Sequence, residues 1–232
     1  MFRNREDAAL QLAQCFKGRV LCDPLVLSIP RGGVLIGAVL ARELNAELDV
    51  VQAAKLRAPG DPCTVVGAVS ECGDVYLNPR LRDVEGLTES YVRAESGRQL
   101  ATISHRRKLI DAVRPPATVA SRSVIVTDDG IATGSTMVAA LQFVKAKSPY
   151  ELLVAVPVAS EEGLELIGPW CDEKVSLVTP EVFRAIDEFY EGFPTVDDAR
   201  VLDVLRDFAP NSGRHEGVKH GRGAAQVGSC RD

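Results

Sequence analysis

Residues 124–136 read VIVTDDGIATGST, and this stretch decides the fold. Its apolar beginning is typical of a buried strand, and the Thr-Gly-Ser-Thr at its end is typical of the start of a helix. Two adjacent carboxylates, Asp128 and Asp129, lie between them. Because ligands bind beyond the carboxyl ends of the strands in an open α/β sheet, we expect these polar residues at a binding edge.

The two halves of this turn suit different chemical groups. Residues 133–136 offer backbone N–H groups and hydroxyls at a helix N-terminus, which is a binding site for an anion. Carboxylates repel a phosphate but accept hydrogen bonds from sugar hydroxyls, which suits Asp128 and Asp129. A ligand with vicinal hydroxyls a few ångströms from a phosphate, such as ribose 5-phosphate, satisfies both halves. An ordinary capped strand–turn–helix is the structural alternative.

Short β-branched runs alternate with helical patterns along the chain, which is typical of an α/β fold with a mainly parallel central sheet flanked by helices. We expect strands at residues 25–29, 48–54, 65–70, 75–77, 123–127, 152–156 and 175–178. We expect helices at about residues 33–44, 88–113 and 197–208, one from the Thr-Gly turn to residue 147, and one that begins near Asn4.

Residues 1–208 are expected to form one domain, in which a β-hairpin and the long helix are an insertion. Residues 209–232 contain five glycines and no aromatic residue. Because such a composition cannot bury a core, we expect this segment to be a disordered carboxy-terminal tail.

Composition excludes several classes of protein. The longest uncharged apolar run, residues 34–41, is far shorter than the ~20 residues that span a bilayer. The net charge is −5, and charged residues stand where a signal peptide would be apolar. We therefore expect a soluble cytoplasmic protein with no membrane or clear nucleic-acid partner. The six cysteines lack metal-ligand spacing and are expected to be buried free thiols.

The strand, the two acids and the Thr-Gly-Ser-Thr loop resemble the signature of the type I phosphoribosyltransferases, and similarity to one branch of that family covers about residues 1–208. The resemblance implies the family's fold, with a small hood over the acceptor. It implies that Asp128 and Asp129 hold the 2′- and 3′-hydroxyls of the ribose in phosphoribosyl pyrophosphate. The 5′-phosphate would be held by Ala132, Thr133, Gly134, Ser135 and Thr136.

A second loop, Ser28-Ile29-Pro30-Arg31-Gly32-Gly33, follows the first expected strand. Two glycines beside a cation permit a tight turn that offers N–H groups to an anion, and a plain structural turn is the alternative. By resemblance, Arg31, Gly32 and Gly33 would meet the pyrophosphate leaving group, and a non-proline cis peptide would occur here. Lys55, expected at the end of strand 48–54, would contact the same pyrophosphate or be a solvated strand end.

Three further segments bear on the site. The hood is expected to consist of the amino-terminal helix and residues 180–190, PEVFRAIDEFY, whose aromatic rings either stack on the acceptor or pack on the sheet. His105-Arg106-Arg107-Lys108 on the long helix is interpreted as a solvated basic face, or else as a pyrophosphate contact made on closure. Ala132 stands where relatives acting on hypoxanthine and guanine have an aspartate, which disfavours a 6-oxopurine acceptor.

The resemblance implies a pentosyltransferase that moves phosphoribosyl from phosphoribosyl pyrophosphate to a nitrogenous acceptor, a nucleobase in our first hypothesis, and releases pyrophosphate. Its catalytic residues would be Arg31, Lys55, Asp128 and Asp129, assisted by Mg²⁺ held mainly by substrate and water. One alternative is a regulatory protein that senses phosphoribosyl pyrophosphate or a nucleotide in the same pocket. Another is an interaction protein that keeps the fold with little activity. The oligomeric state, a homodimer included, stays open.

Overall fold

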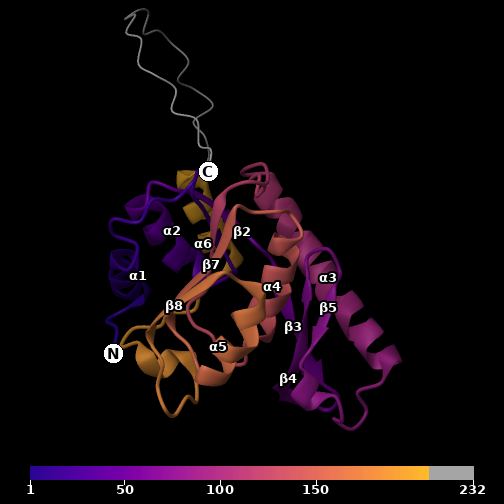
Figure 1. The fold of residues 1–232 in the computed structure, drawn as a ribbon. Helices are drawn as coiled ribbons and strands as arrows, with labels where there is room; N and C mark the ends of the chain where they lie inside the picture. Colours follow the sequence, from indigo (N-terminus) through magenta and orange to yellow (C-terminus); the bar gives the residue numbers. More distant parts are fainter. Residues whose placement is uncertain (209–232) are drawn as a thin grey trace, which may run out of the picture.

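The computed structural model of the protein describes residues 1–208, so the expected tail at 209–232 lies outside the described residues. Figure 1 shows the arrangement of the elements. The helices are α1 (Arg5–Gln14), α2 (Gly33–Glu43), α3 (Glu89–Asp111), α4 (Ser135–Lys145), α5 (Glu161–Ile167) and α6 (Asp198–Asp207). The strands are β1 (Leu25–Ser28), β2 (Glu47–Val50), β3 (Ala53–Ala58), β4 (Asp61–Ser70), β5 (Val75–Leu77), β6 (Ser123–Thr127), β7 (Glu151–Val158) and β8 (Glu173–Val178). Short 3₁₀ helices occupy Pro79–Leu81, Gly168–Trp170 and Ile186–Phe189.

A parallel sheet of five strands, in the order β2-β1-β6-β7-β8, forms the centre of the molecule. The chain runs outward from β1 to β2 on one side, and outward from β6 through β7 to β8 on the other. The direction of winding therefore changes between β1 and β6. At such a switch point the loops after two neighbouring strands diverge, and this leaves room for a ligand.

Helices cover both faces of this sheet, which explains the continuous apolar runs in its strands. Val26 of β1 belongs to the core under α1, α2 and α6, together with Leu40 of α2. The next residue, Leu27, belongs to the core under α4 and α5, together with Leu141. Because neighbouring strand residues point to opposite faces, the two cores lie back to back and hold the switch point between them.

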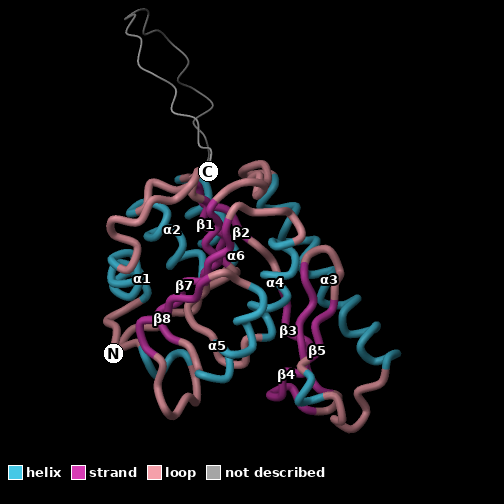
Figure 2. The backbone as a smooth tube through the Cα atoms, in the orientation of Figure 1, coloured by secondary structure: helices cyan, strands magenta, loops and turns pink. Residues whose placement is uncertain are grey.

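A smaller lobe stands beside the main sheet and consists of β3, β4, β5 and α3 (Figure 2). Its three strands are antiparallel, in the order β3-β4-β5. Leu56 and Val69 of the strands pack with Ile103 of α3 in a core of their own. The expected hairpin insertion is thus present with one strand more than predicted, because β3 pairs with β4.

The expected strand at residues 48–54 is wrong as a single element. The backbone N–H of Val51 still donates to the carbonyl of Ser28 (3.1 Å), whereas that of Gln52 donates to the carboxylate of Glu71 in the small lobe (3.1 Å). The chain therefore changes sheets at these two residues. Lys55 consequently lies inside β3 and not at the end of an inner strand.

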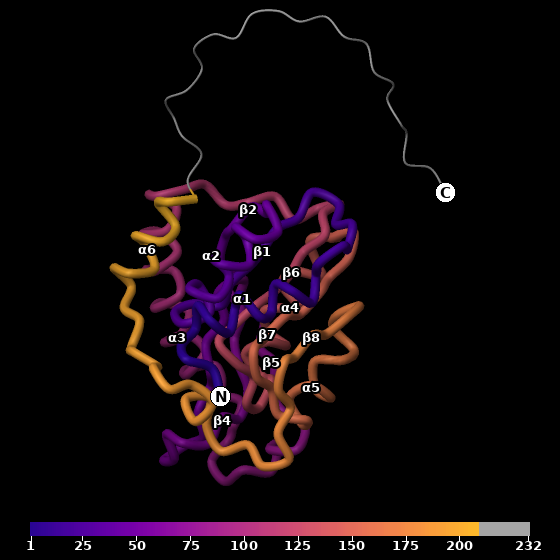
Figure 3. Tube along the Cα trace, turned by 90° about the vertical axis from the view of Figure 1, so that its left-hand side faces the viewer, coloured from indigo at the N-terminus to yellow at the C-terminus, as the bar shows by residue number. Residues whose placement is uncertain are grey.

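The N-terminal residues lie beside the segment around residues 189–191, and Figures 1 and 3 show the N-terminus next to this late part of the chain. The N–H of Phe2 donates to the carbonyl of Phe189, and the N–H of Glu191 donates to the carbonyl of Phe2, both at 2.8 Å. α1 then begins as predicted, because the Asn4 side chain accepts the N–H of Asp7 (2.9 Å).

The cysteines differ from expectation in one respect. Cys15, Cys22, Cys63, Cys72 and Cys171 are free, but the first four are exposed and the fifth is half-buried. Branched aliphatic residues fill the core positions of the strands, so the prediction of buried thiols is wrong for these five. No helix within residues 1–208 has the length and apolar character to cross a membrane.

Candidate functional site

A cavity of about 430 Å³ opens at the switch point between the loops that follow β1 and β6. Its walls come from both loops, from β3, from the start of α4 and from residues 186–196 near the end of the described chain. The charged residues that line it are Arg5, Arg31, Lys55, Asp128 and Asp129.

Asp128 and Asp129 follow β6, and each engages one carboxylate oxygen within the protein. Oδ1 of Asp128 accepts the backbone N–H of Asp129 at 2.8 Å. Oδ2 of Asp129 accepts two hydrogen bonds from Arg5, at 3.2 Å from Nε and 3.0 Å from Nη2. The other oxygen of each carboxylate has no hydrogen-bond donor among residues 1–208. Two acceptor oxygens at the cavity wall are thus available to two ligand hydroxyls.

The two acids differ in their electrostatic surroundings. Burial raises the pKa of the Asp128 carboxyl well above its ordinary range, and the neighbouring charge of Asp129 raises it further. The ammonium of Lys55 acts in the opposite direction on the pKa of Asp128. Asp129, by contrast, forms an ion pair with Arg5, whose side chain is only 7% exposed. Burial therefore disfavours the charge of Asp128, whereas Asp129 has a cationic partner.

The main chain of Asp129 is also fixed. The hydroxyl of Tyr190 donates to the Asp129 carbonyl at 2.7 Å. Burial raises the pKa of Tyr190, and the nearby carboxylate of Asp129 raises it further, so this hydroxyl stays protonated and keeps its donor. The side chain of Asp129 is thus held by Arg5 of α1, and its backbone is held by Tyr190.

The start of α4 forms the second part of the site. Gly134 adopts a left-handed conformation (φ +78°) as the residue before the helix, where a side chain would be strained and would also meet the carbonyl of Gly163 at 3.0 Å. The Ser160 hydroxyl fixes this turn by donating to the carbonyl of Ala132. The first N–H groups of α4 have no acceptor in the helix, and Thr133, Gly134 and Thr136 line the cavity there. The geometry of this helix start matches the one expected for a phosphate-binding loop, and its ligand stays a prediction.

Arg31 and Lys55 also line the cavity. Both residues are exposed, and neither side chain forms a hydrogen bond or ion pair in the described part of the chain. The Pro30–Arg31 peptide bond is cis, as the resemblance led us to expect. Gly32 lies against the carboxylate of Asp129, and a Cβ at this position would collide with it. The loop after β1 can therefore approach the acidic turn only with glycine here.

The cavity brings together all of the predicted site residues except Gly33 and Ser135. Gly33 packs beneath the acidic turn, where a Cβ would lie 2.9 Å from the Cα of Asp128. The side chain of Ser135 is buried, and its hydroxyl has no partner within residues 1–208. The ligand roles given to the predicted residues stay predictions.

The hood differs from the one expected. Of residues 180–190, only Ile186 lines the cavity, while Phe183 and Phe189 stack on each other with ring centroids 5.5 Å apart and pack on the core. The aromatic residues of this stretch follow the packing alternative. The amino-terminal helix α1, which was expected in the hood, contributes Arg5 to this wall, and residues 193–196 supply most of the rest. In the sequence, Phe193-Pro194 shortly before the acidic start of α6 is a weak signal that residues 193–196 belong to the wall. No local signal identifies Arg5.

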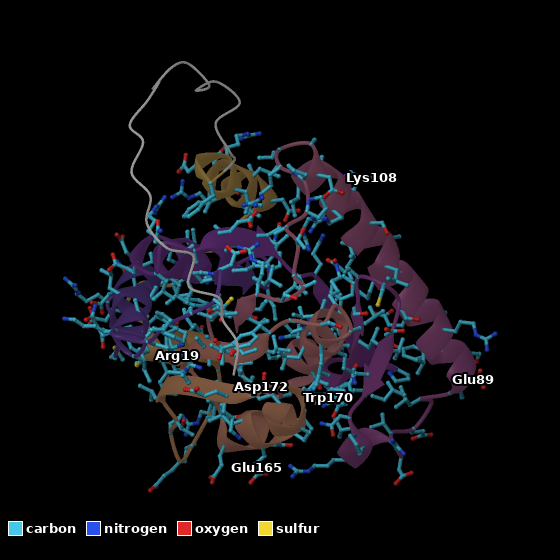
Figure 4. All side chains as sticks on the ribbon, turned by 45° about the horizontal axis from the view of Figure 1, so that its top comes forward. Arg19, Glu89, Lys108, Glu165, Trp170 and Asp172 are labelled. Atoms are coloured by element: carbon cyan, nitrogen blue, oxygen red, sulfur yellow. The ribbon has the colours of Figure 1, made fainter. Side chains whose placement is uncertain are left out.

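The basic run on α3 is only partly a solvated face. His105 and Lys108 are exposed, and Figure 4 shows Lys108 near one end of the long helix, with Glu89 at the other. Arg106 and Arg107 are half-buried instead: Nε of Arg106 donates to Asp198 (2.9 Å), and Nε of Arg107 donates to Asp111 (2.7 Å). None of these side chains lines the cavity.

No group of three or more His, Cys, Asp or Glu residues that could hold a metal ion occurs within the described chain. The cavity offers two carboxylates, each with one oxygen already engaged. This donor set fits a Mg²⁺ ion that takes most of its ligands from a bound phosphate compound and from water.

Comparison with known proteins gives three findings. A family model described as phosphoribosyl transferase domain matches residues 12–191. Two Mycobacterium tuberculosis proteins, named "Putative phosphoribosyl transferase MT0597" in strain CDC 1551 and "Putative phosphoribosyl transferase Rv0571c" in strain H37Rv, are each 33% identical over 213 residues, or 90% of this chain. This chain covers 48% of each, so it spans about half the length of these curated relatives.

The crystal structure of the protein TT1426 from Thermus thermophilus is similar along nearly its whole length. It shares 40% sequence identity with this chain and has a TM-score of 0.76, with coverage of 90% of this chain and 99% of that one. The similarity confirms the predicted α/β fold class with its mainly parallel sheet.

Proposed function

This chain belongs to the phosphoribosyl transferase domain family, and we propose that the protein transfers a phosphoribosyl group from phosphoribosyl pyrophosphate to a nitrogenous acceptor. The family, a family of pentosyltransferases, is the one that the sequence resembled. The donor, the acceptor and the turnover of the whole protein belong to the proposal.

One observation carries the proposal most directly. Two carboxylate oxygens without a protein donor in residues 1–208 and the N-terminus of α4 line the same cavity, a few residues apart in one turn. The carboxylate oxygens can accept hydrogen bonds from hydroxyl groups, and the N–H groups of the helix N-terminus can donate to a phosphate. A ribose 5-phosphate unit presents both kinds of group. The exposed cations Arg31 and Lys55 also line the cavity and would bind a second anion, the pyrophosphate.

In the proposed reaction, the bond from the anomeric carbon to pyrophosphate breaks, positive charge develops on the sugar, and a nitrogen of the acceptor bonds to that carbon and loses its proton to solvent. Asp128 and Asp129 orient the ribose through its hydroxyls, and the N–H groups at the start of α4 hold the 5′-phosphate. Arg31 and Lys55 stabilise the charge that accumulates on the departing pyrophosphate, which is the main electrostatic task of such a site. A bound Mg²⁺ ion would neutralise further charge on the leaving group.

The acceptor is proposed to be a nucleobase other than a 6-oxopurine. Ala132 gives the turn no carboxyl group at the position where a proton would be exchanged with a purine ring. The adjoining wall is mostly apolar, with Ile186, Phe193 and Val196. Such a wall suits the face of a planar ring. We place the protein in the cytoplasm without a nucleic-acid partner, in keeping with its net charge of −5.

The test is a pyrophosphate-release assay with purified protein, phosphoribosyl pyrophosphate, Mg²⁺ and a panel of nitrogenous bases. We expect release that depends on one base of the panel and that Asp129→Asn strongly reduces. Calorimetry on the same samples separates the alternatives. Tight binding of phosphoribosyl pyrophosphate without release would favour the regulatory protein, and absence of both binding and release would refute the proposal.

A further inference from the structure

Arg5 is a buried cation at the centre of the site, although it comes from the first turn of α1. Two of its nitrogens donate to Oδ2 of Asp129, and a third, Nη1, donates to the carbonyl of Pro194 at 2.8 Å. Its Cζ lies 3.6 Å from the centroid of the Phe193 ring. The guanidinium is thus fixed on three sides: by the acidic turn, by a backbone carbonyl and by an aromatic face.

Both hydrogen bonds to the carboxylate end on the same oxygen. Oδ2 of Asp129 is saturated by Arg5, so Oδ1 is the oxygen left for a ligand. With the guanidinium fixed by Pro194 and Phe193, the Asp129 side chain cannot exchange its two oxygens without breaking these bonds. Gly32 packs against the same oxygen, Oδ2, where any side chain would collide with it.

Arg5 also compensates an electrostatic cost in the turn. Asp128 and Asp129 are adjacent carboxylates, and the charge of Asp129 raises the pKa of Asp128. A guanidinium at 3.0 Å from one of them opposes this repulsion. Without this cation, the repulsion between the two carboxylates would favour side-chain rotamers that move them apart.

We propose that Arg5 is a positioning residue for the recognition of ribose: it selects which oxygen of Asp129 faces the ligand and joins the hood to the sugar site. The proposal rests on the proposed function, because it gives Asp129 its role towards the ribose hydroxyls. Arg5 does not itself touch the ligand in this scheme. Its effect should therefore be confined to ligands that contain the sugar.

The experiment compares two probes, ribose 5-phosphate and inorganic pyrophosphate, by calorimetry on the full-length chain. For Arg5→Gln we expect about tenfold weaker binding of ribose 5-phosphate and less than twofold change for pyrophosphate. Arg5→Lys keeps the charge but not the forked geometry, and should recover part of the loss. The matched control is Arg3→Gln, since Arg3 lies on the same segment but pairs with Asp7 at the surface.

A double variant shows whether Arg5 acts through Asp129. In an Asp129→Asn background, the further change Arg5→Gln should cause no additional loss of ribose 5-phosphate affinity and should restore part of it, because the amide can then turn its oxygen towards the sugar. Equal weakening of both probes, additive losses in the double variant, or unchanged ribose 5-phosphate binding by Arg5→Gln would each overturn the proposal. If Arg5→Gln does not fold, Arg5→Lys is judged by the same ratio of the two affinities.

Failure of the proposed function would look different. A wild-type protein that binds neither probe would contradict the phosphoribosyl assignment. The melting temperatures of the ligand-free single and double variants then decide the part played by Arg5. Non-additive shifts would support the coupling to Asp129, and additive shifts would refute it.

Discussion

The carboxylates Asp128 and Asp129 (here the acidic end of the site) and the cations Arg31 and Lys55 (its basic end) differ in how firmly the protein holds them. At the acidic end, Asp129 is bound by Arg5 and Tyr190, and Asp128 by the backbone of its neighbour. At the basic end, Arg31 and Lys55 are exposed, and their side chains have no partner in residues 1–208. The protein itself orients the acidic end, whereas the side chains of the basic end are left without hydrogen-bond or ion-pair contacts within residues 1–208.

This difference matches the groups that each end would bind. Hydroxyls are recognised by direction, so their acceptors must be oriented in advance, and pre-organised groups lose less entropy on binding. A polyphosphate is recognised by charge, which exposed and flexible cations can supply from several positions. The acidic end should therefore respond sharply to small chemical changes, and the basic end only gradually.

The largest effect is expected for Asp129→Asn. Arg5 would hold the amide oxygen and turn the NH₂ group towards the ligand, so that a donor replaces the acceptor that faces the sugar hydroxyl. A charged hydrogen bond contributes about 1.5–3 kcal/mol, so affinity for ribose 5-phosphate should fall roughly ten- to a hundredfold. Calorimetry measures this affinity. An unchanged value would mean that the ligand does not bind at the acidic turn.

A smaller effect is expected at the basic end. Arg31→Ala and Lys55→Ala should each weaken pyrophosphate binding about three- to fivefold at low salt, because interactions between exposed charges are worth about 1 kcal/mol or less. The difference from the wild type should shrink as salt is raised. Titrations at two ionic strengths test this, and a large, salt-independent loss would mean that this end is as rigid as the other.

For Asp128→Asn we expect a gain in stability. Since burial raises the pKa of Asp128 in the folded protein, its favourable neutral form is fully present below the ordinary carboxyl pKa, and this stability is lost as pH rises through the raised value. The variant should melt higher than the wild type by about a few degrees at pH 8, and the difference should vanish towards pH 4. Thermal melts across this range check the sign. A variant less stable at every pH would contradict it.

The smallest effect is expected for His105→Ala. This residue is exposed on α3 and lies outside the cavity, so affinity for either probe should change less than twofold. A strong loss would point to closure of the small lobe on the ligand, the alternative interpretation of the basic run.

Local signals predicted much of this architecture. The strand at 123–127, the turn after it and the cap formed by Asn4 and Asp7 depend on residues close in sequence. The break at Val51 and Gln52 was missed because the apolar pattern continues while the chain passes from one sheet to the other. Periodicity reports burial, and not which sheet buries the residue.

The candidate site was predictable only where its residues cluster in sequence. Asp129 and Thr133 belong to one motif, whereas Arg5 reaches Asp129 across a separation of 124 residues. Nothing in the neighbourhood of Arg5 distinguishes it from Arg3, which lies at the surface. Such roles depend on contacts between distant segments, and local sequence patterns do not reveal these contacts.

The pairing of Phe2 with Phe189 and Tyr190 has a consequence for how the protein folds during its synthesis. Residues 2–5 are synthesised long before the segment that they contact, residues 189–194. Until that segment is made, Arg5 has neither Pro194 nor Phe193 to hold it. The sheet can begin to form during synthesis, but the hood is completed only when translation of the domain is nearly over, so a truncated chain would possess the motif without a finished pocket.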